Sequence, residues 1–282
     1  MKRPDLHMHT TASDGIYTPT QLVHLAHKAD ITFCAVTDHD TVSGIAEAAT
    51  AARERGMAFA SGVELSAEGE AEVHILGYGV CPENPVLRRF FAGLEEERIQ
   101  RFRKMAEKLL AQGLRIDPDA VIAQGGPSVG RVHLARALMQ EGYVQSVQEA
   151  FSRYLGRNCS AYVPRAPLAA TKAISFLRQV GATPVLAHPG LLKWPAERFL
   201  PLLSAWQDAG LQGLEVYHPA NARQYAWYDR LARSRGLLVT GGSDYHDGAS
   251  HGQLGETIST WPSACEDAWA LFDTLREHSF SF

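Results

Sequence analysis

Short apolar runs alternate with amphipathic segments on both sides of a middle region. Apolar or β-branched runs that are bounded by turn residues predict buried strands. We expect such strands at Thr32–Thr37, Ala58–Glu64, Glu72–Gly77, Thr183–Ala187, Gly213–Tyr217 and Leu237–Gly241, with a short one ending at His7. Because helical patterns separate most of these runs, the sequence predicts a parallel α/β sheet.

Amphipathic helices are predicted between the strands. Thr18-Pro19-Thr20-Gln21 opens the first, with a capping residue followed by proline at the first helical position. The others are expected at Ser43–Arg55, Lys172–Gln179, Ala196–Ala209 and Asn221–Ser234. About seven such units without a dinucleotide-binding glycine fingerprint favour a TIM-like barrel.

The middle region has a helical pattern with no convincing strand. Helices are expected at Pro85–Gln112, Pro118–Ala123, Arg131–Glu141 and Val147–Tyr154. We interpret residues 83–165 as a helical cap inserted over one end of a barrel that is formed by residues 1–82 and 166–282.

Composition places the chain among ordinary globular proteins. Its 282 residues are 45% hydrophobic and 21% charged, which is ample for a large core. No apolar run approaches the roughly 18 residues of a membrane helix, so no membrane association is expected. A candidate metal motif begins at His7, which leaves no room for a signal peptide, and we expect a cytoplasmic protein. The four cysteines are scattered and form no zinc ribbon or disulfide framework.

Charge is distributed unevenly. The net charge is −4, which disfavours general nucleic-acid binding. Residues 83–165 carry 13 Lys and Arg against 9 Asp and Glu, whereas the rest carries 14 against 22. An acidic body with a basic insertion suits a cation site served by a segment that receives an anion. Ordinary variation among helix surfaces explains the same counts equally well.

Histidines and carboxylates recur at the ends of the predicted strands. Because these ends converge on one face of a parallel barrel, we expect the side chains to meet there. The set is His7, His9, Asp14, His39, Glu64, His74, His188, Asp244 and His246. Imidazoles and carboxylates without thiolates suit Mn²⁺, Zn²⁺ or Fe. One histidine alone would be a weak signal, but the joint pattern predicts two or three divalent ions.

The motifs around these residues resemble one known family. DLHMHTTASDG at 5–15, AVTDHD at 35–40, GVE at 62–64, His74, LAHP at 186–189 and GSDYH at 242–246 occur in the order found in the PHP (polymerase and histidinol phosphatase) family. The resemblance implies a distorted (β/α)₇ barrel with a trinuclear centre. It assigns His7, His9, Glu64 and Asp244 to one ion, Glu64, His74 and His188 to a second, and Asp14, His39 and His246 to the third.

The middle region offers a candidate anion site. Ser128 is interpreted as the cap of the helix that begins near Arg131, where backbone N–H groups, a hydroxyl, a guanidinium and His133 converge. A plain capped helix with solvent-facing side chains is the alternative. Arg101 and Arg103 are better explained as a surface face paired with Glu95–Glu97.

Further candidates follow strand ends on the same barrel face. Asp40 is a candidate substrate contact, and His218 is a candidate phosphate contact or leaving-group acid. Tyr217 is a candidate platform for a base, although core packing is as good an interpretation.

The combination of a PHP-like barrel, an inserted helical cap and these strand-end motifs resembles the stand-alone PHP phosphoesterases. That resemblance implies hydrolysis of the 3′-phosphate of 3′,5′-nucleotide bisphosphates, and trimming of short 5′-phosphorylated RNA by relatives. We expect attack by a metal-bridging hydroxide without a phosphoenzyme. The predicted partners are a nucleotide or a short RNA end, with no stable protein partner. A phosphatase of a small phosphomonoester such as histidinol phosphate, or a non-catalytic metal-binding subunit, remains the alternative.

Overall fold

The computed structural model describes residues 3–68, 72–165, 168–248, 252–262 and 264–278. Seven strands form one sheet in chain order. They are β1 (Pro4–Asp5), β2 (Phe33–Val36), β3 (Ala58–Glu68), β4 (Glu72–Tyr78), β5 (Thr183–Leu186), β6 (Gly213–Tyr217) and β7 (Leu238–Gly241). Each corresponds to a predicted strand, although β3 runs four residues beyond its predicted end.

The sheet is not parallel throughout, which corrects the prediction. β4 is antiparallel to both β3 and β5, whereas the other neighbouring pairs are parallel. The segment between β3 and β4 is only three residues long. A parallel crossover needs a dozen or more residues, so the two strands pair as a hairpin.

The first and last strands approach each other and nearly close the sheet. The Leu6 amide donates to the Gly241 carbonyl at 3.1 Å, and the Asp244 amide donates to the His7 carbonyl at 2.9 Å. Met8 and Tyr245 form an isolated parallel bridge just beyond. These contacts produce the distorted seven-stranded barrel that the sequence predicts.

Helices surround the barrel. They are α1 (Pro19–Lys28), α2 (Ile45–Glu54), α7 (Ala170–Gln179), α8 (Ala196–Asp208), α9 (Tyr225–Ser234) and α10 (Ala264–His278). Thr18 caps α1 as predicted, and it also forms a capping box with Gln21. The predicted helix at Asn221–Ser234 starts late, because the short 3₁₀ turn η4 (Pro219–Asn221) precedes it.

The sequence analysis did not predict α10. Its signal is a stripe of buried Ala264, Ala268, Leu271 and Leu275 at helical spacing. None of the helices in the described ranges combines the length and apolar character that a bilayer crossing requires.

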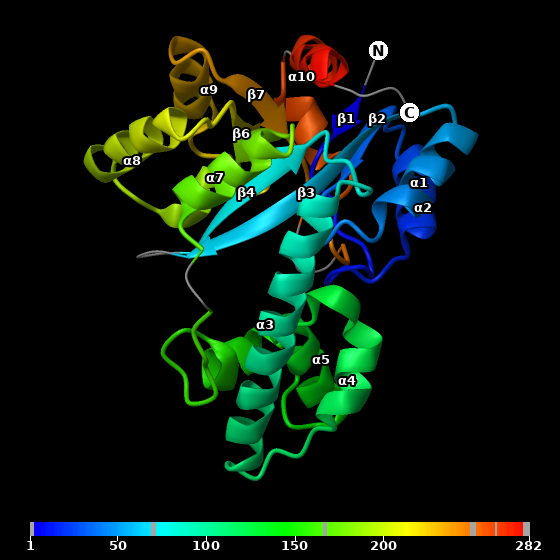
Figure 1. Ribbon diagram of the computed structural model, residues 1–282, viewed down its shortest axis with the longest axis vertical. Coiled ribbons are helices and arrows are strands. Elements are labelled where there is room, and N and C mark those ends of the chain that lie inside the picture. The colour runs from blue at the N-terminus through cyan, green and yellow to red at the C-terminus, as the bar shows by residue number, and fades with distance from the viewer. Residues whose placement is uncertain (1–2, 69–71, 166–167, 249–251, 263, 279–282) are drawn as a thin grey trace.

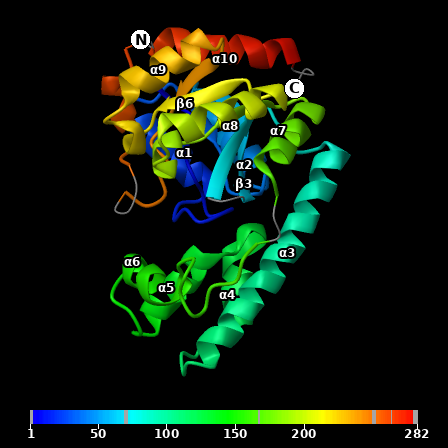
Figure 2. The same cartoon turned by 90° about the vertical axis from the view of Figure 1, so that its left-hand side faces the viewer.

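Residues 83–165, called the cap below, lie under one end of the barrel (Figures 1 and 2). The cap contains α3 (Pro85–Leu110), α4 (Pro118–Gly125), the 3₁₀ turn η1 (Gly126–Ser128), α5 (Arg131–Gln140), α6 (Val147–Ala150) and a π-helical turn at Phe151–Leu155. Asn84 caps α3 by accepting from the Val86 amide at 2.9 Å.

The cap has a hydrophobic cluster separate from those of the barrel. Phe102, Met105 and Leu109 of α3 pack with Leu134 and Leu138 of α5. The first turns of the same α3 instead place Leu87 and Phe91 in the barrel core. One continuous helix is therefore shared between the two hydrophobic clusters.

We predict that Phe102→Ala selectively weakens the cap. The variant removes a fully buried aromatic side chain, which costs about 3–5 kcal/mol. Chemical denaturation combined with limited proteolysis should show earlier cleavage within residues 83–165 than in the barrel. The matched control is Arg103→Ala on the same helix, where the side chain is 47% exposed and a change within about 0.5 kcal/mol is expected. Equal effects of both variants would contradict the assignment of Phe102 to a core.

Candidate metal centre

All nine candidate ligands converge at the barrel end that faces the cap. They come from the segments after β1 (His7, His9, Asp14), β2 (His39), β5 (His188) and β7 (Asp244, His246), from within β3 (Glu64), and from β4 (His74). His74 lies near the beginning of β4 and not at a strand end as predicted. Because β4 is antiparallel, its beginning lies at the same barrel edge as the ends of its neighbours.

Glu64 lies at the centre of this group. Its Oε2 atom is 3.3 Å from the Nε2 atoms of both His7 and His9, and 3.1 Å from His39 Nδ1. Its Oε1 atom is 2.9 Å from His74 Nδ1 and 2.9 Å from His188 Nε2. One fully buried carboxylate therefore contacts five imidazoles.

Ligand atoms gather at three overlapping positions, each within a 4.8 Å spread. One consists of His7, His9, Glu64 and Asp244; another of His9, Asp14, His39 and His246; and a third of His39, Glu64 and His74. His188 reaches the third through Glu64 Oε1. The first group has the same four residues that the family resemblance implies for one ion, whereas the second adds His9 and the third has His39 in place of His188. A fourth group consists of His7, Glu215 and His218.

The buried polar atoms of these groups support a fit to divalent ions. His7 Nε2, both ring nitrogens of His9, Asp14 Oδ1 and Glu64 Oε2 are buried without an aligned hydrogen-bond partner. Buried polar atoms rarely stay unsatisfied. Hard carboxylate oxygens and imidazole nitrogens that point at shared positions fit ions of the Mn²⁺, Zn²⁺ or Fe type.

The buried acids and histidines of the cluster shift one another's pKa values. Burial alone would lower the pKa of His9, but the Asp244 and Glu64 carboxylates raise it to about 10. Burial would likewise lower the pKa of His74, yet Glu64 and Glu72 raise it to about 10. Burial would raise the pKa of Glu64, but His39 and His74 hold it well below its ordinary value. Carboxylates and imidazoles in this cluster therefore favour each other's charged forms at Glu64, His9 and His74.

Backbone strain concentrates at the same place. Asp40, His188 and Asp244 have φ angles of 51°, 27° and 55°, which are uncommon for residues other than glycine. Gly242 is required for close approach, since a Cβ atom there would lie 2.4 Å from the His7 Cβ atom. Strained residues of this kind persist where packing over-determines them, typically at functional sites.

Glu215 orients two of the candidate ligands, and the sequence analysis missed it. Its carboxylate accepts from His7 Nδ1 at 2.9 Å and from the His188 amide at 2.7 Å. The bond to Nδ1 fixes the tautomer that leaves Nε2 of His7 directed at the cluster. The available signal was a lone acidic residue inside the apolar strand Gly213–Tyr217.

Two further buried acids hold the ligand loops. Asp38 accepts from the Thr10 amide at 2.7 Å and from Ser13 Oγ at 2.6 Å, and so shapes the loop that carries Asp14. It does not cap α2, because Gly44 occupies that position. Asp5 accepts from the Ser243 amide at 2.9 Å, next to Asp244.

His218 lies beside the cluster. Its Nδ1 atom accepts from the Ala220 amide at 3.0 Å, so a neutral ring carries its hydrogen on Nε2. Nε2 is 3.4 Å from Asp244 Oδ2, and the ring centroid is 5.2 Å from that of His188.

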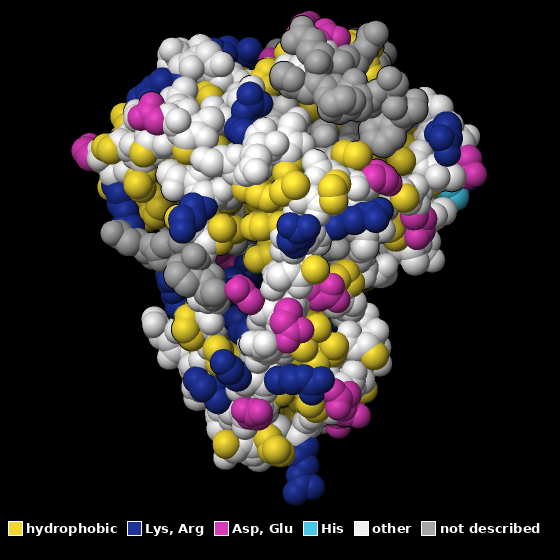
Figure 3. Space-filling view, viewed as in Figure 1, with side chains coloured by type: hydrophobic (Ala, Val, Ile, Leu, Met, Phe, Trp, Pro, Cys, Tyr) yellow, Lys and Arg dark blue, Asp and Glu magenta, His cyan; other side chains and the backbone are white. Residues whose placement is uncertain are grey.

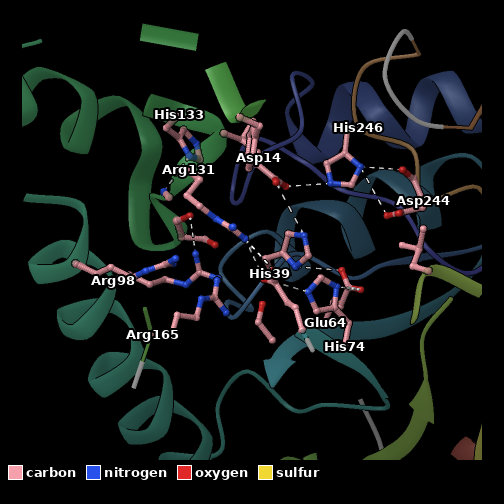
Figure 4. Close-up of a pocket in the computed structure, with 18 of the residues that line it drawn as sticks. Asp14, His39, Glu64, His74, Arg98, Arg131, His133, Arg165, Asp244 and His246 are labelled. Atoms are coloured by element: carbon pink, nitrogen blue, oxygen red, sulfur yellow. Dashed lines mark hydrogen bonds and ion pairs between the residues drawn. The ribbon is translucent and has the colours of Figure 1, made fainter. Parts of the chain in front are cut away.

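A cavity of about 240 Å³ joins the cluster to the cap. Figure 4 shows Arg98, Arg131, His133 and Arg165 facing the barrel ligands across it. Lys and Arg side chains are also visible in the hollow between the barrel and the cap in Figure 3. The cap therefore presents cations to the space in front of the cluster.

The candidate anion site around Ser128, Arg131 and His133 differs in detail from the prediction. Gly130, not Ser128, occupies the capping position of α5, and Ser128 lies in η1 with a buried, unpartnered hydroxyl. His133 is turned inward, where Nδ1 accepts from the Gly130 amide at 3.2 Å and burial lowers its pKa. Arg131 points into the cavity, 2.9 Å from Glu72 and 5.5 Å from the Phe151 ring. Ser128, Arg131 and His133 all line the cavity, as a shared anion site requires.

Asp40 does not lie free for substrate, contrary to the prediction. Its buried carboxylate pairs with Arg98 and, at 3.3 Å, with Arg165, and these guanidinium groups hold its pKa to about 2 against the raising effect of burial. Asp40 instead fixes two arginines at the cavity. Arg98 and Arg165 were missed because only tertiary packing brings them to Asp40. Arg101, interpreted as a surface residue, is 7% exposed and also lines the cavity.

Tyr217 belongs to the core. Its ring stacks on Trp261 with a 5.4 Å centroid separation, and its hydroxyl donates to Asp229 at 3.3 Å. Tyr217 is 5% exposed and is absent from the described lining of the cavity. Of the two interpretations left open by the sequence, the structure supports core packing.

Comparison with known proteins identifies the family. The PHP domain model matches residues 5–157, more than half of the chain. The chain belongs to the PHP family.

Relatives with assigned activities cover almost the whole chain. A 3′,5′-nucleoside bisphosphate phosphatase of Chromobacterium violaceum is 33% identical, over 95% of this chain and 96% of the relative. The 5′-3′ exoribonuclease Rnm of Escherichia coli is 34% identical, over 95% and 93%. The structure of a candidate metal-dependent phosphoesterase from Bifidobacterium adolescentis superposes with a TM-score of 0.85 at 31% identity, covering 97% and 96%. The similarity therefore extends over both the barrel and the cap of this chain.

We predict that Glu215→Gln weakens metal binding. The amide preserves the size of the side chain but removes the charge that orients His7, a loss that typically costs 10–100-fold in affinity. Chelator competition with Mn²⁺ or Zn²⁺ would measure the change, and circular dichroism would confirm folding. Glu197→Gln, an exposed acid on α8, is the control and should bind metal like the parent. An unchanged affinity in Glu215→Gln would contradict the orienting role.

Proposed function

We propose that this chain removes the 3′-phosphate from 3′,5′-nucleotide bisphosphates and, by the same chemistry, trims short 5′-phosphorylated RNA. The chain is a PHP phosphoesterase, a hydrolase of phosphoric ester bonds. The observation that supports the finer proposal is the cavity, which has metal-type ligands on one side and a group of arginines on the other. That arrangement suits a substrate with two separate anionic groups.

The nine clustered residues are proposed to hold two or three divalent ions, which supply an activated water and neutralise phosphoryl oxygens. The identity of the ions (Mn²⁺, Zn²⁺ or Fe) and a cytoplasmic location stay predictions. Glu64 contributes to more than one position, because each of its oxygens contacts a different set of imidazoles. Glu215 and Asp38 hold the ligand segments before substrate arrives.

The cap is proposed to bind the 5′-phosphate. Arg131 projects into the cavity, while Asp40 aligns Arg98 and Arg165 beside it. The buried Ser128 hydroxyl has no partner and can donate to a phosphate oxygen. Planar guanidinium groups recognise phosphate with paired hydrogen bonds. The side chain of Glu72, which is 37% exposed, pairs with Arg131. The 5′-phosphate would replace Glu72 as the partner of Arg131.

We predict a strong preference for two phosphates. With Mn²⁺ present, kcat/KM should be highest for adenosine 3′,5′-bisphosphate and lower for 3′-AMP, and near background for 5′-AMP and histidinol phosphate. Phosphate release measured on all four compounds tests this. Equal hydrolysis of 5′-AMP and the bisphosphate would contradict the two-phosphate proposal.

Arg131→Gln sharpens the same test. A hydrogen bond to a charged group contributes about 1.5–3 kcal/mol, so kcat/KM for the bisphosphate should fall roughly 10–100-fold. Activity toward 3′-AMP, which lacks the 5′-phosphate, should change little. Arg103→Gln is the matched control on the exposed face of α3, and its substrate preference should stay unchanged.

His218 is proposed to protonate the leaving ribose oxygen, because its Nε2 faces the cluster beside Asp244. A general acid produces a descending alkaline limb in the pH profile of kcat, where the acid loses its proton. We predict that His218→Asn flattens that limb and lowers kcat about 10²–10⁴-fold. A variant with an unchanged profile would remove His218 from this role.

A further inference from the structure

A second hollow lies next to the cavity and is not used by the proposed reaction. It has a volume of about 630 Å³ and lies between the 3₁₀ turn η3 (Pro189–Leu192) and η4, the turns that follow β5 and β6. Lys193, Trp194, Arg223, Gln224 and Tyr228 contribute to its walls. We call it the η3–η4 groove.

The groove adjoins segments that carry candidate residues of the metal centre. The turn η3 directly follows His188, and η4 directly follows His218. Leu191 lines the cavity with 53% of its surface exposed, whereas its neighbour Gly190 lines the groove. The groove and the cavity therefore lie on either side of the turn η3.

The two turns are held rigidly together. Asn221 Oδ1 accepts from the Gly190 amide at 2.7 Å, and Asn221 Nδ2 donates to the Glu215 carbonyl at 2.8 Å. A Cβ atom on Gly190 would lie 2.5 Å from the Ala220 carbonyl oxygen, so the turns pack at backbone distance. Because Asn221 links η3 to the strand that carries Glu215, the groove wall keeps a fixed position relative to the cluster.

The charge of the groove is opposite to that of the barrel around it. Lys193 and Arg223 are exposed, and none of the described residues that line the groove is acidic. The chain outside the cap has an excess of Asp and Glu. Lys193 also has a φ of 51°, a conformation usually left to Gly or Asn at the end of a helical turn. Lys193 therefore adds an exposed cation on strained backbone to the groove wall.

An aromatic side chain accompanies the cations. Trp194 lines the groove, and the Arg198 guanidinium lies 4.4 Å from its ring centroid. Cations beside an aromatic ring characterise sites for single-stranded nucleic acids, where rings stack on bases and cations follow the backbone.

We propose that the η3–η4 groove binds the nucleotides of a single-stranded RNA that lie on the 3′ side of the bond to be cleaved. This inference rests on the proposed function, because it assumes that the first nucleotide fills the cavity with its 3′-phosphate at the cluster. The following nucleotides then cross Leu191 and contact Lys193, Trp194 and Arg223. A nucleotide bisphosphate ends at its 3′-phosphate and does not reach the groove.

Three variants test the groove in the Mn²⁺-loaded, full-length protein. Arg223→Glu and Trp194→Ala alter the groove, and Arg230→Glu is the matched charge reversal at an exposed position of α9 outside it. The substrates are a 5′-phosphorylated tetra-adenylate RNA and adenosine 3′,5′-bisphosphate. We expect kcat/KM for the RNA to fall about 5-fold or more in each groove variant. Values for the bisphosphate should stay within about 2-fold, and Arg230→Glu should behave like the parent.

The outcomes separate the groove from the reaction itself. Unchanged RNA cleavage in both groove variants overturns the groove, as does an equal loss in Arg230→Glu. If the parent hydrolyses the bisphosphate but not the RNA, the groove proposal also fails while the proposed phosphatase activity stands. If the parent hydrolyses neither substrate, the proposed function itself is wrong. Intact bisphosphate activity in the variants shows that they are folded.

Discussion

The structure depends on one buried charge, the Glu64 carboxylate in β3. A carboxylate without solvent is costly unless positive charge surrounds it. Five imidazoles from segments after β1, β2 and β5 and from β4 contact it, and nearby carboxylates raise the pKa values of three of them, His7, His9 and His74, which favours their charged form. The barrel must therefore bring most of its strands to one point. The hairpin of β3 and β4 also follows from this need, because antiparallel pairing is what places His74 beside Glu64.

Three further buried acids hold the candidate ligands in position. Glu215, Asp38 and Asp5 do not point at the ligand positions but fix the backbone and ring orientations of residues that do. Their burial explains why the ligand loops can hold unusual φ angles. Rigid ligand loops leave little reorganisation for an ion or substrate to induce.

The barrel strands were predictable because local sequence reveals their apolar runs and turns, and the candidate ligands could be proposed because most of them follow such strands. His7, His9 and Asp244 are examples, since strand ends of a barrel meet on one face. The cap arginines were not predictable in the same way. Arg98 and Arg101 lie on a long polar helix, and only contact with Asp40 and the cavity distinguishes them from surface residues. The core position of Tyr217, one of its two open interpretations, and the wrong capping role of Ser128 have local causes. A register shift between Glu215 and Tyr217 in β6 accompanies the packing of Tyr217 against Trp261, and the unexpected turn η1 removed Ser128 from the capping position.

The shared helix α3 has a consequence for substrate choice. Its first turns are anchored in the barrel core and its later turns in the cap core, with Arg98 between them. A continuous helix that is packed at both ends bends little. It therefore holds the barrel and the cap at a fixed separation. The span between the metal ligands and the arginines is thereby set by the fold itself. Under the proposed function, this fixed span would select compounds by the separation of their two phosphates before any contact with the base is made.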